Sequence, residues 1–119
     1  MLTVIERAEE FENLAEMVSP GKNHVPRLGI LAIELDEKIS KLLPPLRKRT
    51  GVVVADKAVD APYAEDSFAQ GNVIYSINGE AVMSLVELRS AIKSFPVHEP
   101  VVFQVERMGR LKFVATELD

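Results

Sequence analysis

Hydrophobic and polar positions follow two different rhythms along this chain. Over residues 1–18 the apolar side chains recur at steps of three and four positions while glutamates fill the other face, which predicts an amphipathic helix. Ser19-Pro20-Gly21 ends this pattern, and residues 19–26 are expected to form a polar connector with two prolines. The helix would pack on its own domain or on a neighbouring one, or it would offer an apolar stripe for dimerisation.

After residue 26 the pattern changes to short apolar runs of strand length, several of them rich in β-branched residues. Strands are predicted for residues 28–35, 51–55, 73–77, 101–107 and 110–118. Asn78-Gly79, directly after one run, is a strong signal for a tight turn. Met108-Gly109 would join the last two strands as a hairpin.

Two short helices are predicted between these strands. Asp36 is placed to cap the first, and the Pro-Pro pair at residues 44–45 must break or distort it, because a proline inside a helix loses a hydrogen bond and clashes with the preceding turn. Ser84 and Glu87 form a Ser-x-x-Glu capping box at the start of the second helix, which covers residues 85–95. Strands with a few short helices among them indicate an α+β domain.

The length and composition are those of one globular domain. The chain has 119 residues, of which 47% are hydrophobic and 27% charged. It has no cysteine, which excludes disulfides, thiolate zinc sites and cysteine nucleophiles. No apolar run approaches the ~20 residues of a membrane span, and no basic segment followed by an apolar one opens the sequence, so neither a membrane span nor a signal peptide is expected within it.

The net charge of −4 is unevenly distributed. Residues 1–20 hold five glutamates against one arginine, which accounts for −4, so the remaining residues sum to zero. Residues 38–50 hold five basic side chains and no acid. That cluster contains no aromatic residue to stack on a base, and cations are favoured near a helix C-terminus. A solvated helix end is therefore expected there, and nucleic acid is not an expected partner.

The sequence offers no set of residues for catalysis. The two histidines, His24 and His98, are far apart and lack metal-ligand spacing, so each is expected to be an exposed loop residue. No nucleophile-elbow, Walker or dinucleotide-binding glycine pattern is present. We therefore expect no catalytic residue, no metal and no cofactor, and the chain by itself is not expected to be an enzyme.

One arrangement favours binding instead. Residues 27–30 (Arg-Leu-Gly-Ile) lead into a predicted strand through a small loop, whose backbone N–H groups can face an incoming carboxylate. Gly29 allows a close backbone approach. If the strand that follows has a free edge facing the helix at residues 85–95, the gap between them would hold an extended peptide. Main-chain pairing would then supply affinity, and alternate side-chain pockets would supply selectivity.

Five blocks supply a wider context, and they occur in a fixed order. They are residues 27–30 (Arg-Leu-Gly-Ile), 51–54 (Gly-Val-Val-Val), 71–80 (Gly-Asn-Val-Ile-Tyr-Ser-Ile-Asn-Gly-Glu), 88–92 (Leu-Arg-Ser-Ala-Ile) and 105–109 (Val-Glu-Arg-Met-Gly). With these blocks the chain resembles a PDZ domain, of the bacterial type that follows the protease domain in high-temperature-requirement (HtrA) serine proteases. The resemblance implies an α+β, PDZ-like, partly open β-sandwich or barrel of five to six strands with two helices, preceded by the N-terminal helix.

The resemblance also implies a peptide-binding site. Its residues would be Arg27, Leu28, Gly29, Ile30, Leu31, Ala32, Ile33, Leu85, Arg89 and Ile92. Leu28, Gly29 and Ile30 would form the carboxylate-binding loop. Residues 30–33 would be the strand that pairs with the peptide, and the last three residues of the list would face the groove from the helix. Leu28, Ile30 and Ile92 would line the pocket for an apolar C-terminal side chain. Arg89 would either reach the peptide's backbone or an acid, or lie flat as a solvent-facing cap.

Two positions depart from the family pattern. Asn72 stands where an aspartate is usual, so the turn should survive while any ion pair made there should not. Met108-Gly109 replaces the usual Asp-Gly of the hairpin and makes a poorer, permissible turn.

The resulting hypothesis divides the chain into residues 1–26, a helix with its connector, and residues 27–119, a PDZ domain. The domain would capture C-terminal or exposed hydrophobic peptide tails by β-strand addition, as the substrate-recognition and regulatory part of an HtrA-like serine protease. The alternative is a structural interdomain or oligomerisation module with a closed or vestigial groove.

The partners follow from this hypothesis. They would be hydrophobic peptide segments, an attached protease domain and, through the N-terminal helix, a second copy of the chain. The chain lacks the Gly-Asn-Ser-Gly-Gly motif of the protease itself. A periplasmic location is implied by the resemblance alone.

Overall fold

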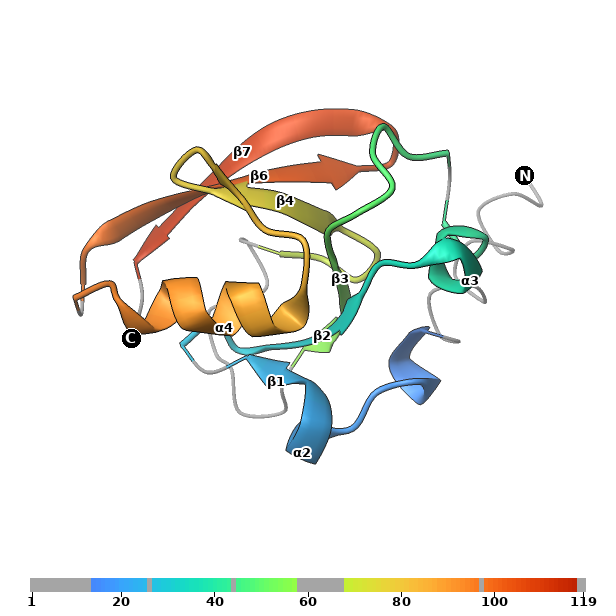
Figure 1. The fold of residues 1–119 in the computed structure, drawn as a ribbon, viewed down its shortest axis with the longest axis horizontal. Coiled ribbons are helices and arrows are strands. Elements are labelled where there is room, and N and C mark those ends of the chain that lie inside the picture. The colour runs from blue at the N-terminus through green and yellow to red at the C-terminus, as the bar shows by residue number, and fades with distance from the viewer. Residues whose placement is uncertain (1–13, 26, 44, 58–67, 97, 118–119) are drawn as a thin grey trace.

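The structure is a computed structural model that describes residues 14–25, 27–43, 45–57, 68–96 and 98–117. Figure 1 shows its elements, which are α2 (Pro20–Asn23), β1 (His24–Val25), β2 (Ile30–Glu34), α3 (Glu37–Ser40), β3 (Val52–Lys57), β4 (Val73–Ile77), β5 (Glu80–Ala81), α4 (Leu85–Lys93), β6 (Pro100–Arg107) and β7 (Arg110–Glu117). Of the predicted N-terminal helix, residues 1–13 lie outside the described part, and residues 14–16 are helical.

The strands form one antiparallel sheet in the order β1-β2-β3-β4-β6-β7, with β5 paired to β4 off this path. This open sheet with short helices confirms the predicted α+β class. It has seven strands where five to six were expected. The difference comes from β1 and β5, which are two residues long each and too short to give a periodic signal in the sequence.

The sheet is covered on both faces, by α4 on one and by α3 on the other, so that the two helices lie on opposite sides of β3 (Figure 1). Val52 and Val54 of β3 belong to the core beneath α4, while Val53 and Ala55 belong to the core beneath α3. Successive side chains of a strand point to opposite faces. Burial of both faces therefore explains why residues 52–55 of this strand are an unbroken apolar run.

Both predicted tight turns are present. Asn78 and Gly79 have φ values of 49° and 85°, and Met108 and Gly109 have 51° and 83°. Two consecutive positive φ values are typical of the hairpin turns that match the twist of the flanking strands. Asn78 suits its position, whereas Met108 holds a left-handed conformation that its side chain disfavours.

The predicted helix caps are also formed. The Asp36 carboxylate accepts a hydrogen bond from the Ile39 N–H at 2.8 Å, and the Ser84 hydroxyl accepts one from the Glu87 N–H at 3.1 Å. The Glu87 carboxylate reaches back to the N–H of Met83, one residue before the cap. The helix after Asp36 ends at Ser40, ahead of the two prolines.

The segment predicted as a polar connector, residues 19–26, contains two short regular elements. Residues 20–25 form α2 and then β1, which pairs with β2. Val25 is completely buried within the core beneath α4. A single apolar residue between His24 and a proline gives no periodicity to detect, so its burial arises from tertiary packing that the sequence pattern does not reveal.

Candidate peptide-binding groove

The groove predicted from the sequence lies between β2 and α4, which are neighbours in the structure (Figure 1). The structure brings Leu28, Ile30 and Ile92 into one buried cluster, with Leu85 packed against it. The Leu85 N–H at the start of α4 donates to the Glu34 carboxylate at the end of β2 over 3.3 Å. The loop, the strand and the helix that were predicted to form the groove are therefore adjacent.

The loop before β2 has an unusual backbone. Arg27 and Gly29 both have positive φ values, 76° and 68°. The Arg27 guanidinium donates to the Ile92 carbonyl near the end of α4, where a cation also interacts favourably with the helix dipole. Arg27 thus ties the loop to the helix, which fixes the width of the groove at this end.

Side chains along β2 alternate between the two cores. Ile30 and Ala32 are fully buried beneath α4, whereas Ile33 is half-buried against the core on the α3 side. Leu31 is also buried. Of the strand residues predicted to bind peptide, Ile33 thus presents its side chain to the far face of the sheet and can offer the groove only its main chain.

The outer edge of β2 is covered by the chain's own residues. In β1, Val25 is paired with Ile30 and His24 with Leu31, in antiparallel register. One residue earlier, the Asn23 side-chain amide donates to the Ala32 carbonyl at 2.9 Å. Peptide addition to β2 requires a free strand edge, and over Ile30–Ala32 that edge is occupied.

The Val25 side chain is part of the core beneath α4. It is fully buried in the same cluster as Leu28, Ile30 and Ile92, the residues predicted to line the pocket for a terminal apolar side chain. Its carbonyl oxygen accepts a hydrogen bond of 3.3 Å from the Leu28 N–H, within the loop predicted to bind a carboxylate.

Arg89, on α4, contacts the main chain of this segment. Its Nη2 donates to the carbonyl of Lys22 at 2.7 Å and to the carbonyl of His24 at 2.9 Å. Of the two roles considered from the sequence, the geometry matches a backbone-binding one, with the chain's own connector in the place of a peptide.

A second polar site, which was not predicted from the sequence, lies on the α3 side of the sheet. Glu106 of β6 is only 2% exposed. Its carboxylate accepts hydrogen bonds from the Tyr75 hydroxyl at 2.6 Å and from the Arg47 N–H at 3.0 Å. Burial raises the pKa of the Tyr75 hydroxyl well above its usual range, and the bond to Glu106 raises it further. The Lys48 ammonium lies 5.3 Å from the centre of the Tyr75 ring.

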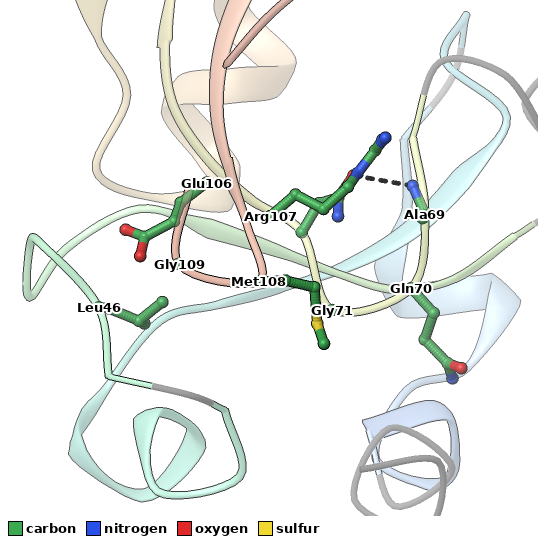
Figure 2. Close-up of a pocket in the computed structure, with 9 residues that line it drawn as sticks. Leu46, Ala69, Gln70, Gly71, Glu106, Arg107, Met108 and Gly109 are labelled. Carbon is green, nitrogen blue, oxygen red and sulfur yellow. Dashed lines mark hydrogen bonds between the residues drawn. The ribbon is translucent and has the colours of Figure 1, made fainter. Parts of the chain in front are cut away.

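A cavity of about 190 Å³ lies beside this second site. Figure 2 shows that Glu106 and Arg107 come to it from β6 and Leu46 from the segment after α3. At its rim the Asn72 side-chain oxygen accepts a hydrogen bond from the Ala69 N–H at 2.9 Å, drawn as the dashed line in Figure 2, and another from the Arg107 guanidinium at 2.9 Å. The turn at Asn72 therefore survives without a carboxylate, as predicted, and Arg107 makes a hydrogen bond there in place of an ion pair.

The described part of the chain holds no group of three or more side chains suited to a metal ion. His24 and His98 are both exposed. Within the same residues, no helix is long and apolar enough to cross a membrane.

Comparison with known proteins identifies the family to which this domain belongs. The sequence profile of the PDZ domain family matches residues 26–118. The chain belongs to the PDZ domain family. It is 30% identical over 118 residues to a DegP-like periplasmic serine endoprotease of Pseudomonas fluorescens, covering 98% of this chain and 24% of the relative. It is 28% identical over 104 residues to the periplasmic serine endoprotease DegP of Escherichia coli K12, covering 87% of this chain and 22% of the relative.

The fold agrees with a solved member of the family. The crystal structure of the HtrA3 PDZ domain bound to a phage-derived ligand, FGRWV, superposes with a TM-score of 0.64 at 19% identity. The superposition covers 76% of this chain and 82% of that one, and it shows the PDZ fold. The predicted resemblance to HtrA-type PDZ domains is thereby confirmed.

The PDZ domain spans about a quarter of the length of the curated relatives it matches. It corresponds to a non-catalytic PDZ portion of these proteases, which confirms the prediction that the chain itself is not an enzyme.

Proposed function

We propose that this PDZ domain captures C-terminal or exposed hydrophobic peptide tails by adding them as a strand to β2. The observation that carries the proposal is the position of Val25, whose side chain is fully buried while its main chain is paired to Ile30. The region between β2 and α4 thus offers main-chain hydrogen-bonding groups to an extended segment and buries a small apolar side chain. Strand addition is a general mode of peptide recognition, in which main-chain bonds give affinity and pockets give selectivity.

The HtrA3 PDZ domain supports the chemistry of the proposed ligand. The phage-derived ligand of that domain ends in valine, the same residue type as Val25, which is buried against the core beneath α4 here. The proposed ligand-contacting residues are those predicted from the sequence, with Arg89 and the Leu28 N–H binding main-chain oxygens and with Ile33 contributing only its main chain.

The protein containing this domain is proposed to be an HtrA-like serine protease of the periplasm, in which the domain recognises substrates and regulates the protease. The names of its relatives support both parts of this proposal. The division into residues 1–26 and 27–119 stays a prediction. Burial of Val25 indicates that the end of the connector contributes to the core of the domain.

Peptide titration tests the proposal. Fluorescein-labelled FGRWV with a free C-terminal carboxylate should bind in the micromolar range, about −8 kcal/mol, because a single added strand buries little area. The same peptide with a C-terminal amide should bind more weakly, because the loop loses its charged acceptor. Equal binding of the acid and the amide in fluorescence polarisation would show that the loop before β2 does not recognise the peptide carboxylate. Binding of neither peptide by any folded form of the domain, including variants that weaken the pairing of β1 with β2, would contradict the proposal.

The covered edge of β2 favours a second candidate, a structural module with a closed groove. This alternative predicts that the chain contacts another protein domain or a second copy of itself. Sedimentation equilibrium of the full chain over a wide concentration range checks the version with a second copy. A monomer at every concentration would reject self-association, and a dimer without peptide binding would favour it over the first proposal.

A further inference from the structure

We infer that residues 22–25 (Lys-Asn-His-Val) act as an internal competitor, which occupies the groove as a ligand would and must leave before a peptide tail can bind. This inference rests on the proposed function, because it concerns the regulation of the same groove. It assigns the connector a role in controlling access, in addition to linking two parts of a protein.

The segment runs in the direction, and pairs in the register, that we expect of a captured peptide tail. It runs antiparallel to β2, with Val25 opposite Ile30 and His24 opposite Leu31. Val25 is therefore the residue nearest the carboxylate-binding loop, where the last side chain of an added peptide would lie. Its carbonyl oxygen already accepts the Leu28 N–H. A peptide carboxylate would take up that same donor.

The main chain of a bound peptide can replace the segment in its hydrogen bonds to Arg89 and to Ala32. Arg89 binds two carbonyl oxygens, those of Lys22 and His24, and any extended peptide presents carbonyls along that edge. The Ala32 carbonyl accepts from the Asn23 side chain, and a strand laid along β2 offers backbone N–H groups in its place. The pocket around Val25 accepts another apolar side chain. Exchange of one occupant for the other thus conserves the hydrogen bonds of the groove.

The segment is also built from weak elements. The strand β1 has two residues, and α2 has four, with no side-chain hydrogen bond from its N-cap residue Ser19. The bonds from Arg89 are solvent-exposed. Short elements with exposed hydrogen bonds open at low free-energy cost compared with the core of a domain. Burial of Val25 is the main contact that opposes release.

Occupancy of this kind lowers apparent affinity, because a peptide binds only the fraction of molecules whose groove is open. The test compares three full-length proteins for binding of labelled FGRWV: the wild type, the double variant Asn23→Ala with Val25→Ala, and the control Lys22→Ala. The control changes an exposed side chain in the same segment, of which the groove uses only the carbonyl. The double variant should bind about tenfold tighter than the wild type or better, and the control should match the wild type.

Hydrogen exchange on the wild type gives an independent readout. Saturating FGRWV should increase amide exchange in residues 22–25, because the displaced segment loses its pairing with β2. Should the double variant not fold, as judged by circular dichroism, the single variant Asn23→Ala replaces it and should also bind tighter than the control.

The outcomes separate the two proposals. Equal affinity of all folded variants, or binding that leaves residues 22–25 protected, would overturn the internal competitor and leave peptide binding intact. No binding of FGRWV by any folded variant would overturn both the proposed function and this inference.

Discussion

The groove and the Tyr75–Glu106 contact lie on opposite faces of the sheet, and they are stabilised in different ways. The Tyr75 hydroxyl and the Glu106 carboxylate are buried together, so water cannot replace either partner. In the groove, Arg89 donates to main-chain carbonyls in solvent-exposed bonds that any extended peptide can accept in turn. The difference separates contacts that maintain the fold from contacts that can be exchanged, and the proposed function belongs to the second kind.

Removal of the Tyr75 hydroxyl should give the largest loss of stability. In Tyr75→Phe the buried Glu106 carboxylate loses its 2.6 Å donor and keeps the Arg47 N–H, and the loss of a hydrogen bond to a charged group costs about 1.5–3 kcal/mol of unfolding free energy. Urea denaturation measures the loss, with Ser76→Ala as a control on the same strand. Peptide affinity should stay unchanged, because the groove lies on the other face. Unaltered stability would show that the Tyr75–Glu106 contact is not a structural one.

The same pair predicts a dependence on alkaline pH. Because the pKa of Tyr75 is raised in the folded protein, its stabilising contribution is complete below the ordinary tyrosine pKa of about 10 and is lost as pH rises toward the folded value. The unfolding free energy of the wild type should therefore fall more between pH 9 and pH 11 than that of Tyr75→Phe. Parallel curves for the two proteins would contradict this assignment.

Arg89→Met tests the exchangeable contacts. The loss of two exposed hydrogen bonds should reduce stability by about 1 kcal/mol or less. Peptide affinity should change only a few-fold, because Arg89 makes equivalent bonds to the internal segment and to a bound peptide, and its loss weakens both. A large gain in affinity would instead indicate that Arg89 serves the internal segment alone. Arg89→Lys should have a stability and a peptide affinity between those of the wild type and those of Arg89→Met.

Asn72→Asp should produce the smallest effect, and it should be stabilising. A carboxylate there would accept the same bonds from Ala69 and Arg107 and would add an ion pair, worth up to about 1 kcal/mol. The gain should shrink in 1 M salt. Asn78→Asp is the matched control, since Asn78 accepts a hydrogen bond from the Val102 N–H rather than from an arginine. A loss of stability would mean that burial of the charge outweighs the pairing.

Much of the fold could be predicted because its signals are local. The strand at 73–77 has the predicted bounds, and the turn at Asn78-Gly79 follows from two residues that tolerate positive φ. The helix behind Ser84 begins where its cap predicts and ends at Lys93, within the predicted range. The walls of the groove followed from the family resemblance and are adjacent in the structure.

The occupant of the groove could not be predicted, because nothing local marks it. Val25 is one apolar residue in a polar stretch, and its burial depends on Leu28 and Ile92, which lie on either side of the groove. The Tyr75–Glu106 hydrogen bond joins two residues that lie 31 positions apart in the sequence, on β4 and β6. Each residue alone fits an ordinary strand pattern. Contacts of this kind are set by how strands pair, which residue periodicity does not encode.

The covalent link between β1 and β2, residues 26–29, places a limit on what the groove can recognise. A ligand attached through so short a connection has an effective concentration of about millimolar or higher, whatever the amount of protein present. Dilution of the protein therefore does not relieve the competition. If residues 22–25 compete as proposed, only peptide tails that bind more strongly than this tethered segment, or that are present in large local excess, would enter the groove. The hairpin would in this way set a threshold concentration of peptide tails below which the groove stays occupied by the chain itself.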